Sequence, residues 1–98
     1  MGAKEQEAAR RIGFVVTGRV QGVAFRASAR DVARGLELTG FVGNRIDGAV
    51  EGEAQGSRER IEQFVEFLHR GPAWSRVDRV EIAERLPRPH EASFDVIR

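Results

Sequence analysis

Residues 18–26, with the sequence GRVQGVAFR, combine glycines and an arginine in a pattern suited to holding an anion. Gly18 and Gly22 permit backbone conformations with positive φ and a close approach to a ligand. A loop that enters a helix presents unpaired backbone N–H groups, and the helix dipole favours an anion there. Arg26 adds a permanent charge and a planar group that can grip two phosphate oxygens. The same spacing also suits a plain strand-to-helix turn with a solvated arginine, so the loop alone leaves both interpretations open.

The loop does not fit the two common nucleotide-binding motifs. It lacks the lysine and the glycine spacing of G-x-x-x-x-G-K-[ST], and it does not follow G-x-G-x-x-G either. We therefore disfavour nucleoside triphosphates and dinucleotides as ligands.

Hydrophobic periodicity predicts a strand before the loop and a helix after it. Residues 12–17 are apolar and largely β-branched, which predicts a buried strand. From Phe25 to Leu36 apolar residues recur with helical spacing. Gly35 near the end of this segment suits a left-handed C-terminal cap. The loop is therefore expected to lie at the N-terminus of a helix.

The rest of the chain predicts a hairpin, a second helix and two more strands. Asp47 and Gly48 form a turn signal between two β-like segments, and Ser57 is a typical N-cap for the second helix. Residues 80–82 and a short segment from Phe94 are β-like. The order β-α-β-β-α-β plus a terminal strand predicts an α+β, ferredoxin-like (split β-α-β) fold. In it, two helices cover one face of an antiparallel sheet of four to five strands.

Length and composition predict one globular domain. The chain has 98 residues, of which 41% are hydrophobic and 32% are charged. Its net charge of +1 argues against a general nucleic-acid binder. It has no cysteine, which excludes disulfides and thiolate catalysis and fits a reducing cytoplasm. We expect residues 11–98 to form the domain and residues 1–10 a mobile polar tail. We also expect a cytoplasmic monomer that binds neither nucleic acid nor a membrane.

Two blocks of the sequence together resemble the acylphosphatase family. Residues 18–26 are similar to that family's G-R-V-Q-G-V-x-F-R loop. Residues 40–51, GFVGNRIDGAVE, are similar to its G-[WF]-V-x-N-x-x-D-G-x-V-E block, in the same order and at the family's spacing. The resemblance extends over residues 11–98. It implies hydrolysis of carboxyl-phosphate anhydrides, such as acetyl phosphate, without a metal or another cofactor, and inorganic phosphate is expected to be a product and a competitive inhibitor.

The resemblance also implies roles for individual residues. Arg26 matches the family's phosphate-binding catalytic arginine, and Asn44 matches the asparagine that positions the attacking water. The backbone cradle for the phosphate oxygens matches Val20, Gln21, Gly22, Val23, Ala24 and Phe25. Many members carry an aromatic residue one or two places after the arginine, where this chain has Ala27 and Ser28.

The remaining polar candidates are expected to have structural roles. Asp47 precedes a glycine, which favours a turn residue over a general base. His69 is placed to complement a helix C-terminus, and His90 follows a proline-rich connector and is expected to be solvated. The two histidines lie 21 residues apart with no matching carboxylate pattern, so no metal site is predicted.

Other functions are compatible with the predicted fold. An RNA-recognition domain needs aromatic residues on its open sheet face, and residues 50–54, VEGEA, have none. A non-catalytic small-anion-binding or regulatory module fits the element order, but it does not explain Arg26 and Asn44 in their two motifs. The acylphosphatase-like module of a larger carbamoyl-transfer maturation protein would be accompanied by further domains or cysteine-rich zinc segments. These 98 residues contain none, so we favour a free-standing enzyme.

Overall fold

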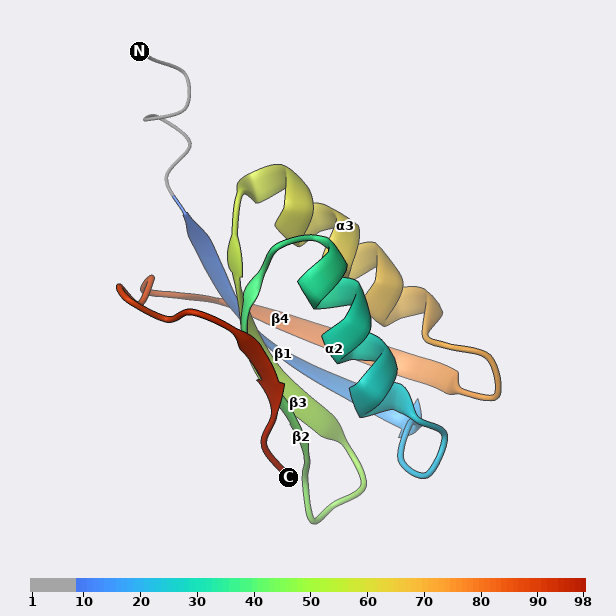
Figure 1. Cartoon of the computed structure of the whole chain (residues 1–98). Coiled ribbons are helices and arrows are strands. Elements are labelled where there is room, and N and C mark those ends of the chain that lie inside the picture. Colours follow the sequence, from blue (N-terminus) through green and yellow to red (C-terminus); the bar gives the residue numbers. More distant parts are fainter. Residues whose placement is uncertain (1–8) are drawn as a thin grey trace.

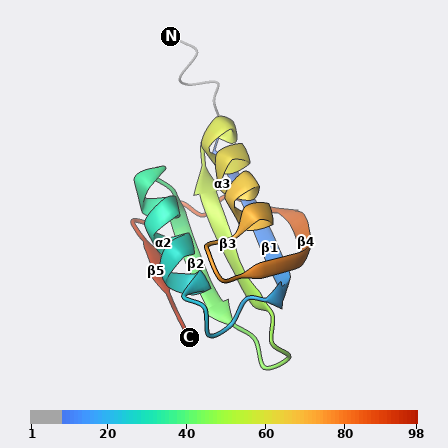
Figure 2. The same cartoon turned by 90° about the vertical axis from the view of Figure 1, so that its right-hand side faces the viewer.

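The computed structural model describes residues 9–98, which form a five-stranded sheet with two helices packed on one face (Figure 1, Figure 2). The tail prediction therefore falls almost entirely outside the described residues. The first strand begins at Arg10, one residue before the expected domain boundary. In chain order the elements are β1 (Arg10–Arg19), α2 (Phe25–Gly35), β2 (Thr39–Asn44), β3 (Val50–Gly56), α3 (Arg58–Arg70), β4 (Arg76–Arg85) and β5 (Phe94–Val96).

The strand order across the sheet is β4-β1-β3-β2-β5. β1 pairs antiparallel with β3 and β4, and β2 pairs antiparallel with β3. This confirms the ferredoxin-like α+β prediction, except that β5 pairs in parallel with β2 and makes the sheet mixed. The reason is the connector after β4. It crosses the sheet at the end where β4 finishes, so β5 starts at that end and runs antiparallel to β4 and parallel to β2 (Figure 1).

The hydrophobic core lies between the helices and one face of the sheet. Ile12, Phe14 and Val16 of β1 are at most 2% exposed, as their alternation predicts. The ring of Phe64 in α3 packs against the rings of Phe14 and Phe94, with centroid distances of 5.5 and 5.8 Å. These contacts join α3 to β1 and β5 through one aromatic cluster.

The helix ends follow the sequence signals with one exception. Ser57 Oγ accepts a hydrogen bond from the Arg60 N–H at 3.3 Å, and Gly71 ends α3 with a φ of 70°. After α2, however, the left-handed residue is Glu37, with a φ of 59°, whereas Gly35 remains helical. Neither α2 nor α3, the helices of residues 9–98, is long and apolar enough to cross a membrane.

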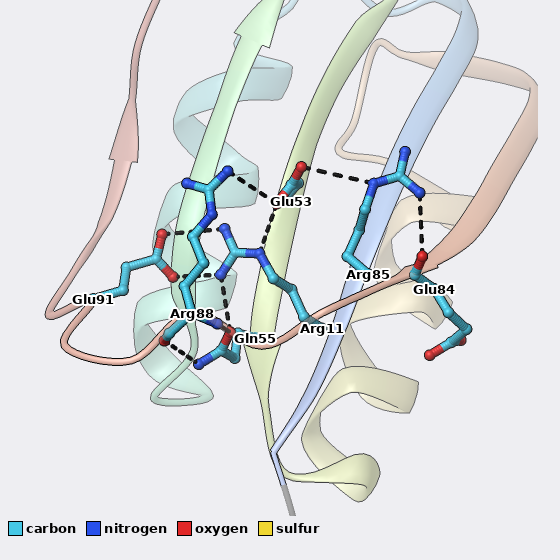
Figure 3. A network of polar contacts seen from close by, with 7 residues as sticks. All are labelled: Arg11, Glu53, Gln55, Glu84, Arg85, Arg88 and Glu91. Carbon is cyan, nitrogen blue, oxygen red and sulfur yellow. Dashed lines mark hydrogen bonds and ion pairs between the residues drawn. The ribbon is translucent and has the colours of Figure 1, made fainter.

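The sheet face away from the helices carries a polar network around Arg11 (Figure 3). Arg11 is only 1% exposed. Its Nε donates to Glu53 Oε1 at 2.6 Å, and its Nη1 donates to Glu91 Oε1 at 2.8 Å and to Gln55 Oε1 at 3.0 Å. Gln55 Nε2 in turn donates to the carbonyl of Arg88 at 3.0 Å. Because Glu91 and Arg88 lie between β4 and β5, the network ties the segment that leads into β5 to β1 and β3.

Candidate active site

The end of β1 and the loop that follows it contain three residues with positive φ. Gly18 has a φ of 130° beside a register shift in the pairing of β1 with β4. A Cβ at Gly18 would collide with the carbonyl oxygen of Arg76, so only glycine fits there. Gly22 has a φ of 77°, and Ala24, which no sequence signal indicated, has a φ of 62°. The chain thus turns sharply into the helix, with the predicted glycines at two of the three left-handed positions.

α2 begins directly after this loop, and no side chain of the described residues caps its N-terminus. The N-cap residue is Ala24, which has no hydrogen-bonding side chain, and the first turn holds no acidic residue. The first hydrogen bond of the helix runs from the Ser28 N–H to the Ala24 carbonyl, at 3.0 Å. The N–H groups of the three residues before Ser28 therefore have no partner within the helix. The start of α2 therefore offers backbone donors and the positive end of the helix dipole to an anion.

Phe25 fixes the position of the helix start. Its side chain is 1% exposed, and its ring lies 5.9 Å from the ring of Phe67 in α3. Burial of a phenylalanine side chain contributes about 2 kcal/mol. Phe25 is thus a core residue at the first position of α2, and it anchors the residue that follows, Arg26.

Arg26 lines a hollow of about 240 Å³ beside the helix start. Sites for drug-sized ligands measure roughly 300–1,000 Å³, so this hollow suits a small ion or a short molecule. Two of the lining residues are arginines and none is acidic, which favours an anion. The hollow is lined by Val20, Gly22, Ala24, Phe25, Arg26, Ala27, Arg30 and Val96.

A larger hollow, of about 410 Å³, lies on the sheet face opposite the helices. Its charged lining residues are Glu51, Glu53 and Glu81 together with one arginine, Arg85. This excess of carboxylates repels an anion, so the larger hollow is not suited to phosphate.

Asn44 is the last residue of β2, and its side-chain oxygen has no partner. The backbone N–H of Asn44 donates to the carbonyl of Arg98 at 2.9 Å, which fixes the end of the strand. Its Oδ1 is buried, and no hydrogen-bond donor for it is found in residues 9–98. Buried polar atoms are normally hydrogen-bonded, so an unpaired oxygen here indicates a place for a water or a ligand.

Gln21 links the loop to the hairpin that follows Asn44. Its Nε2 donates to the carbonyls of Arg45 and Ala49, each at 2.9 Å. Sequence reasoning assigned Gln21 only to the phosphate cradle and missed this bridge, because no spacing pattern relates a loop residue to two carbonyls of a distant hairpin. The bridge holds the loop and the end of β2 in a fixed relation.

Asp47 is a turn residue, as predicted. Its Oδ1 accepts a hydrogen bond from the Ala49 N–H at 3.2 Å, and Gly48 follows with a φ of 98°. That hydrogen bond, together with the guanidinium of Arg45, holds the pKa of Asp47 below its usual range. A carboxylate kept ionised in this way is a poor general base.

Neither histidine lines the hollow at the start of α2. His69 is in the last turn of α3, the position predicted from the sequence. His90 is exposed and has a φ of 69°. Within residues 9–98 no group of three or more histidine, cysteine, aspartate or glutamate side chains is arranged to hold a metal ion.

The expected site residues lie at the same end of the sheet but not in one cavity. Figures 1 and 2 place the β1–α2 loop, the β2–β3 hairpin and the end of β5 together at that end. Five of the expected residues line the hollow, whereas Gln21, Val23 and Asn44 are not among its walls. Val96, which does line it, is in register with Val42, two residues before Asn44. The hollow and the end of β2 are therefore adjacent.

The fold and this arrangement define a ferredoxin-like α+β protein with a helix-start loop suited to a small anion. The family model for acylphosphatase matches residues 12–96. An acylphosphatase of Anaeromyxobacter dehalogenans is 45% identical over 83 residues, which cover 85% of this chain and 89% of that protein. The structure of an acylphosphatase from Coxiella burnetii superposes with a TM-score of 0.89 at 38% identity, covering 99% of this chain and 100% of that one. The crystal structure of acylphosphatase from Bacillus subtilis superposes with a TM-score of 0.87 at 32% identity, covering 91% and 99%. The chain belongs to the acylphosphatase family.

Proposed function

We propose that this protein hydrolyses the carboxyl-phosphate bond of acyl phosphates. An acyl phosphate dianion and water give a carboxylate and dihydrogen phosphate. The oxygen of water bonds to phosphorus, the bond between phosphorus and the acyl oxygen breaks, and the acyl oxygen keeps the electron pair. The observation that carries the proposal is a hollow at the uncapped start of α2 whose charged residues are both arginines, adjacent to the unpaired Oδ1 of Asn44.

In this proposal Arg26 and the loop backbone hold the phosphoryl group. Phosphoryl transfer through a loose transition state requires mainly positioning and charge stabilisation at the equatorial oxygens. The N–H groups of the loop and helix start, from Val20 to Phe25, would cradle these oxygens. Arg26 would bind two of them through its planar guanidinium. Donors held in position by the fold would need little reorganisation during the reaction.

Asn44 would position the attacking water. Its Oδ1 can accept a hydrogen bond from that water, and its amide can donate another. An amide is not a strong base, so its contribution is orientation rather than proton abstraction. The unpaired and buried Oδ1 supports this role, because a water there would satisfy it.

The leaving group explains why so few residues are needed. A departing carboxylate is a weak base and requires no general acid. Charge on the transferring oxygens would be balanced by Arg26 and the backbone N–H groups, so the proposed reaction has no step that requires a metal ion.

We further propose that residues 11–98 form the catalytic domain and that the protein acts as a cytoplasmic monomer. Its small core without cysteine and its near-neutral charge support this, and a small acyl phosphate is the only partner the proposal requires. A non-catalytic anion-binding module would use the same hollow, but it would not need an unpaired Asn44 Oδ1 beside it.

The test is to mix the protein with acetyl phosphate in excess chelator and to measure the release of inorganic phosphate. We expect release well above the uncatalysed rate, inhibited competitively by added phosphate. Release at the uncatalysed rate, with phosphate still bound, would support the binding module instead.

A further inference from the structure

We propose that Arg30 recognises a second anionic group on the acyl side of the substrate. The preferred substrates would then be acyl phosphates whose short acyl group ends in a carboxylate. This inference rests on the proposed function, because it takes a phosphoryl group bound at the start of α2 as its reference point.

Arg30 belongs to the same hollow as Arg26. The two residues are four apart in α2, so they lie on one face of the helix. Four residues advance the helix by about 6 Å, which places Arg30 one turn away from the backbone donors of the loop. A phosphoryl group at the helix start can use Arg26, whereas a group at Arg30 must lie further along the hollow.

No lining residue of this hollow neutralises Arg30. Its recorded ion pair is with its sequence neighbour Asp31, from Nε to Oδ1 at 3.1 Å, and the Asp31 side chain is 69% exposed. Exposed ion pairs of this kind contribute little free energy. A guanidinium has five N–H donors, and this pair uses one of them. Arg30 therefore keeps donors with which to bind a carboxylate in the hollow.

The in-line geometry of phosphoryl transfer also favours an acyl group on the side of Arg30. In phosphoryl transfer the attacking and leaving oxygens lie on opposite sides of phosphorus. Asn44, the proposed water-positioning residue, is not among the residues that line the hollow, so the leaving acyl group would enter the hollow. Ala27 also lines the hollow, and its small side chain leaves room for a short acyl chain.

Phosphonates that do not hydrolyse provide the direct test, because their binding can be measured without turnover. In 5-phosphonopentanoate the carboxylate is spaced from phosphorus as in the acyl phosphate of a four-carbon dicarboxylic acid. Pentylphosphonate has the same chain without the carboxylate. Titration calorimetry of the full chain with each compound, and with inorganic phosphate, separates recognition of the phosphoryl group from recognition of the carboxylate.

We expect the wild-type protein to bind 5-phosphonopentanoate at least about fivefold more tightly than pentylphosphonate, because a charge-assisted hydrogen bond is gained. Arg30→Gln should abolish most of that preference and leave affinity for inorganic phosphate within about twofold. Arg30→Lys, which keeps the charge, should retain part of the preference. Arg79→Gln is the matched control, since it removes the same charge from an exposed residue of β4 whose side chain is 71% accessible.

Three results would overturn the inference. One is equal binding of both phosphonates by the wild-type protein. Another is an Arg30→Gln variant that loses affinity for inorganic phosphate as strongly as for 5-phosphonopentanoate, since Arg30 would then bind the phosphoryl group. The third is an equal loss of preference in Arg79→Gln, which would indicate a general charge effect. None of these depends on catalysis, so they are distinct from a failure to hydrolyse acetyl phosphate.

Discussion

The bridge formed by Gln21 is expected to be needed both for stability and for the position of Asn44. Replacing Gln21 with Met removes the amide and keeps the length of the side chain. Two hydrogen bonds are lost, from Nε2 to the carbonyls of Arg45 and Ala49. Both carbonyls keep a second donor, because the Gly48 N–H donates to Arg45 O at 3.2 Å and the Arg45 N–H donates to Ala49 O at 2.7 Å.

The magnitude follows from this geometry. Since neither carbonyl is orphaned, the cost is that of two ordinary hydrogen bonds, about 2 kcal/mol in the free energy of unfolding. For a domain of this size, each kcal/mol lowers the melting temperature by roughly 4–8 °C, so Gln21→Met should melt about 8–16 °C below the wild type. The kcat for acetyl phosphate should fall as well, because the hairpin that follows Asn44 is no longer held to the loop.

Gln21→Glu provides a sharper version of the same test. An ionised carboxylate only accepts hydrogen bonds, so it would face two carbonyl oxygens without a donor. We expect a larger loss of stability than in Gln21→Met at neutral pH, and a gain relative to Gln21→Met as the glutamate becomes protonated in acid. Thermal unfolding followed by circular dichroism measures both. If Gln21→Met melts within about 2 °C of the wild type and keeps its kcat, the bridge does not position the site.

Two further predictions concern stability, and denaturant unfolding measures both. Burial would raise the pKa of Glu91, but hydrogen bonds from Arg11 and Thr39 and the charges of Arg11 and Arg88 outweigh it, so the pKa lies below its ordinary value of 4.5. The stabilisation by Glu91 is thus complete above pH 4.5 and is lost as the pH falls through the lowered pKa. Glu91→Gln should therefore reduce the loss of unfolding free energy in acid. An unchanged dependence of stability on pH would contradict this role of Glu91. Gly18→Ala should destabilise the fold by at least about 2 kcal/mol, because the added Cβ meets the backbone of β4 at a φ of 130°. Gly35→Ala, a helical position with open space around it, should instead stabilise by about 0.5–1 kcal/mol, and equal effects of the two changes would refute the steric explanation.

Local sequence signals predicted those features that depend on a few neighbouring residues. Ser57 and Gly71 mark the ends of α3 because capping uses side-chain and backbone groups within one turn. Gly18 adopts positive φ at the irregular pairing of β1 with β4, and Gly22 adopts it in the loop that leads into α2. The alternation along β1 predicted its buried face, and the element order then predicted the fold class.

Features that depend on contacts between distant segments could not be predicted in this way. Arginine is usually a surface residue, yet Arg11 is buried. It is paired there with Glu91, which lies 80 residues further along the chain. Ala24 is left-handed although its intrinsic propensity argues against that conformation, so no sequence signal indicated it. The unpaired Oδ1 of Asn44 is likewise a property of the assembled strand ends.

The most direct test of the proposed active site compares phosphate binding with turnover in two variants. Arg26→Ala removes one of the two positive charges that line the hollow, and Asn44→Ala removes the oxygen that would position the water. We expect Arg26→Ala to lose both binding of inorganic phosphate and hydrolysis of acetyl phosphate. Asn44→Ala should bind inorganic phosphate as the wild type does, measured by titration calorimetry, while its kcat falls at least about a hundredfold. An Asn44→Ala variant that turns over acetyl phosphate at the wild-type rate would contradict the account.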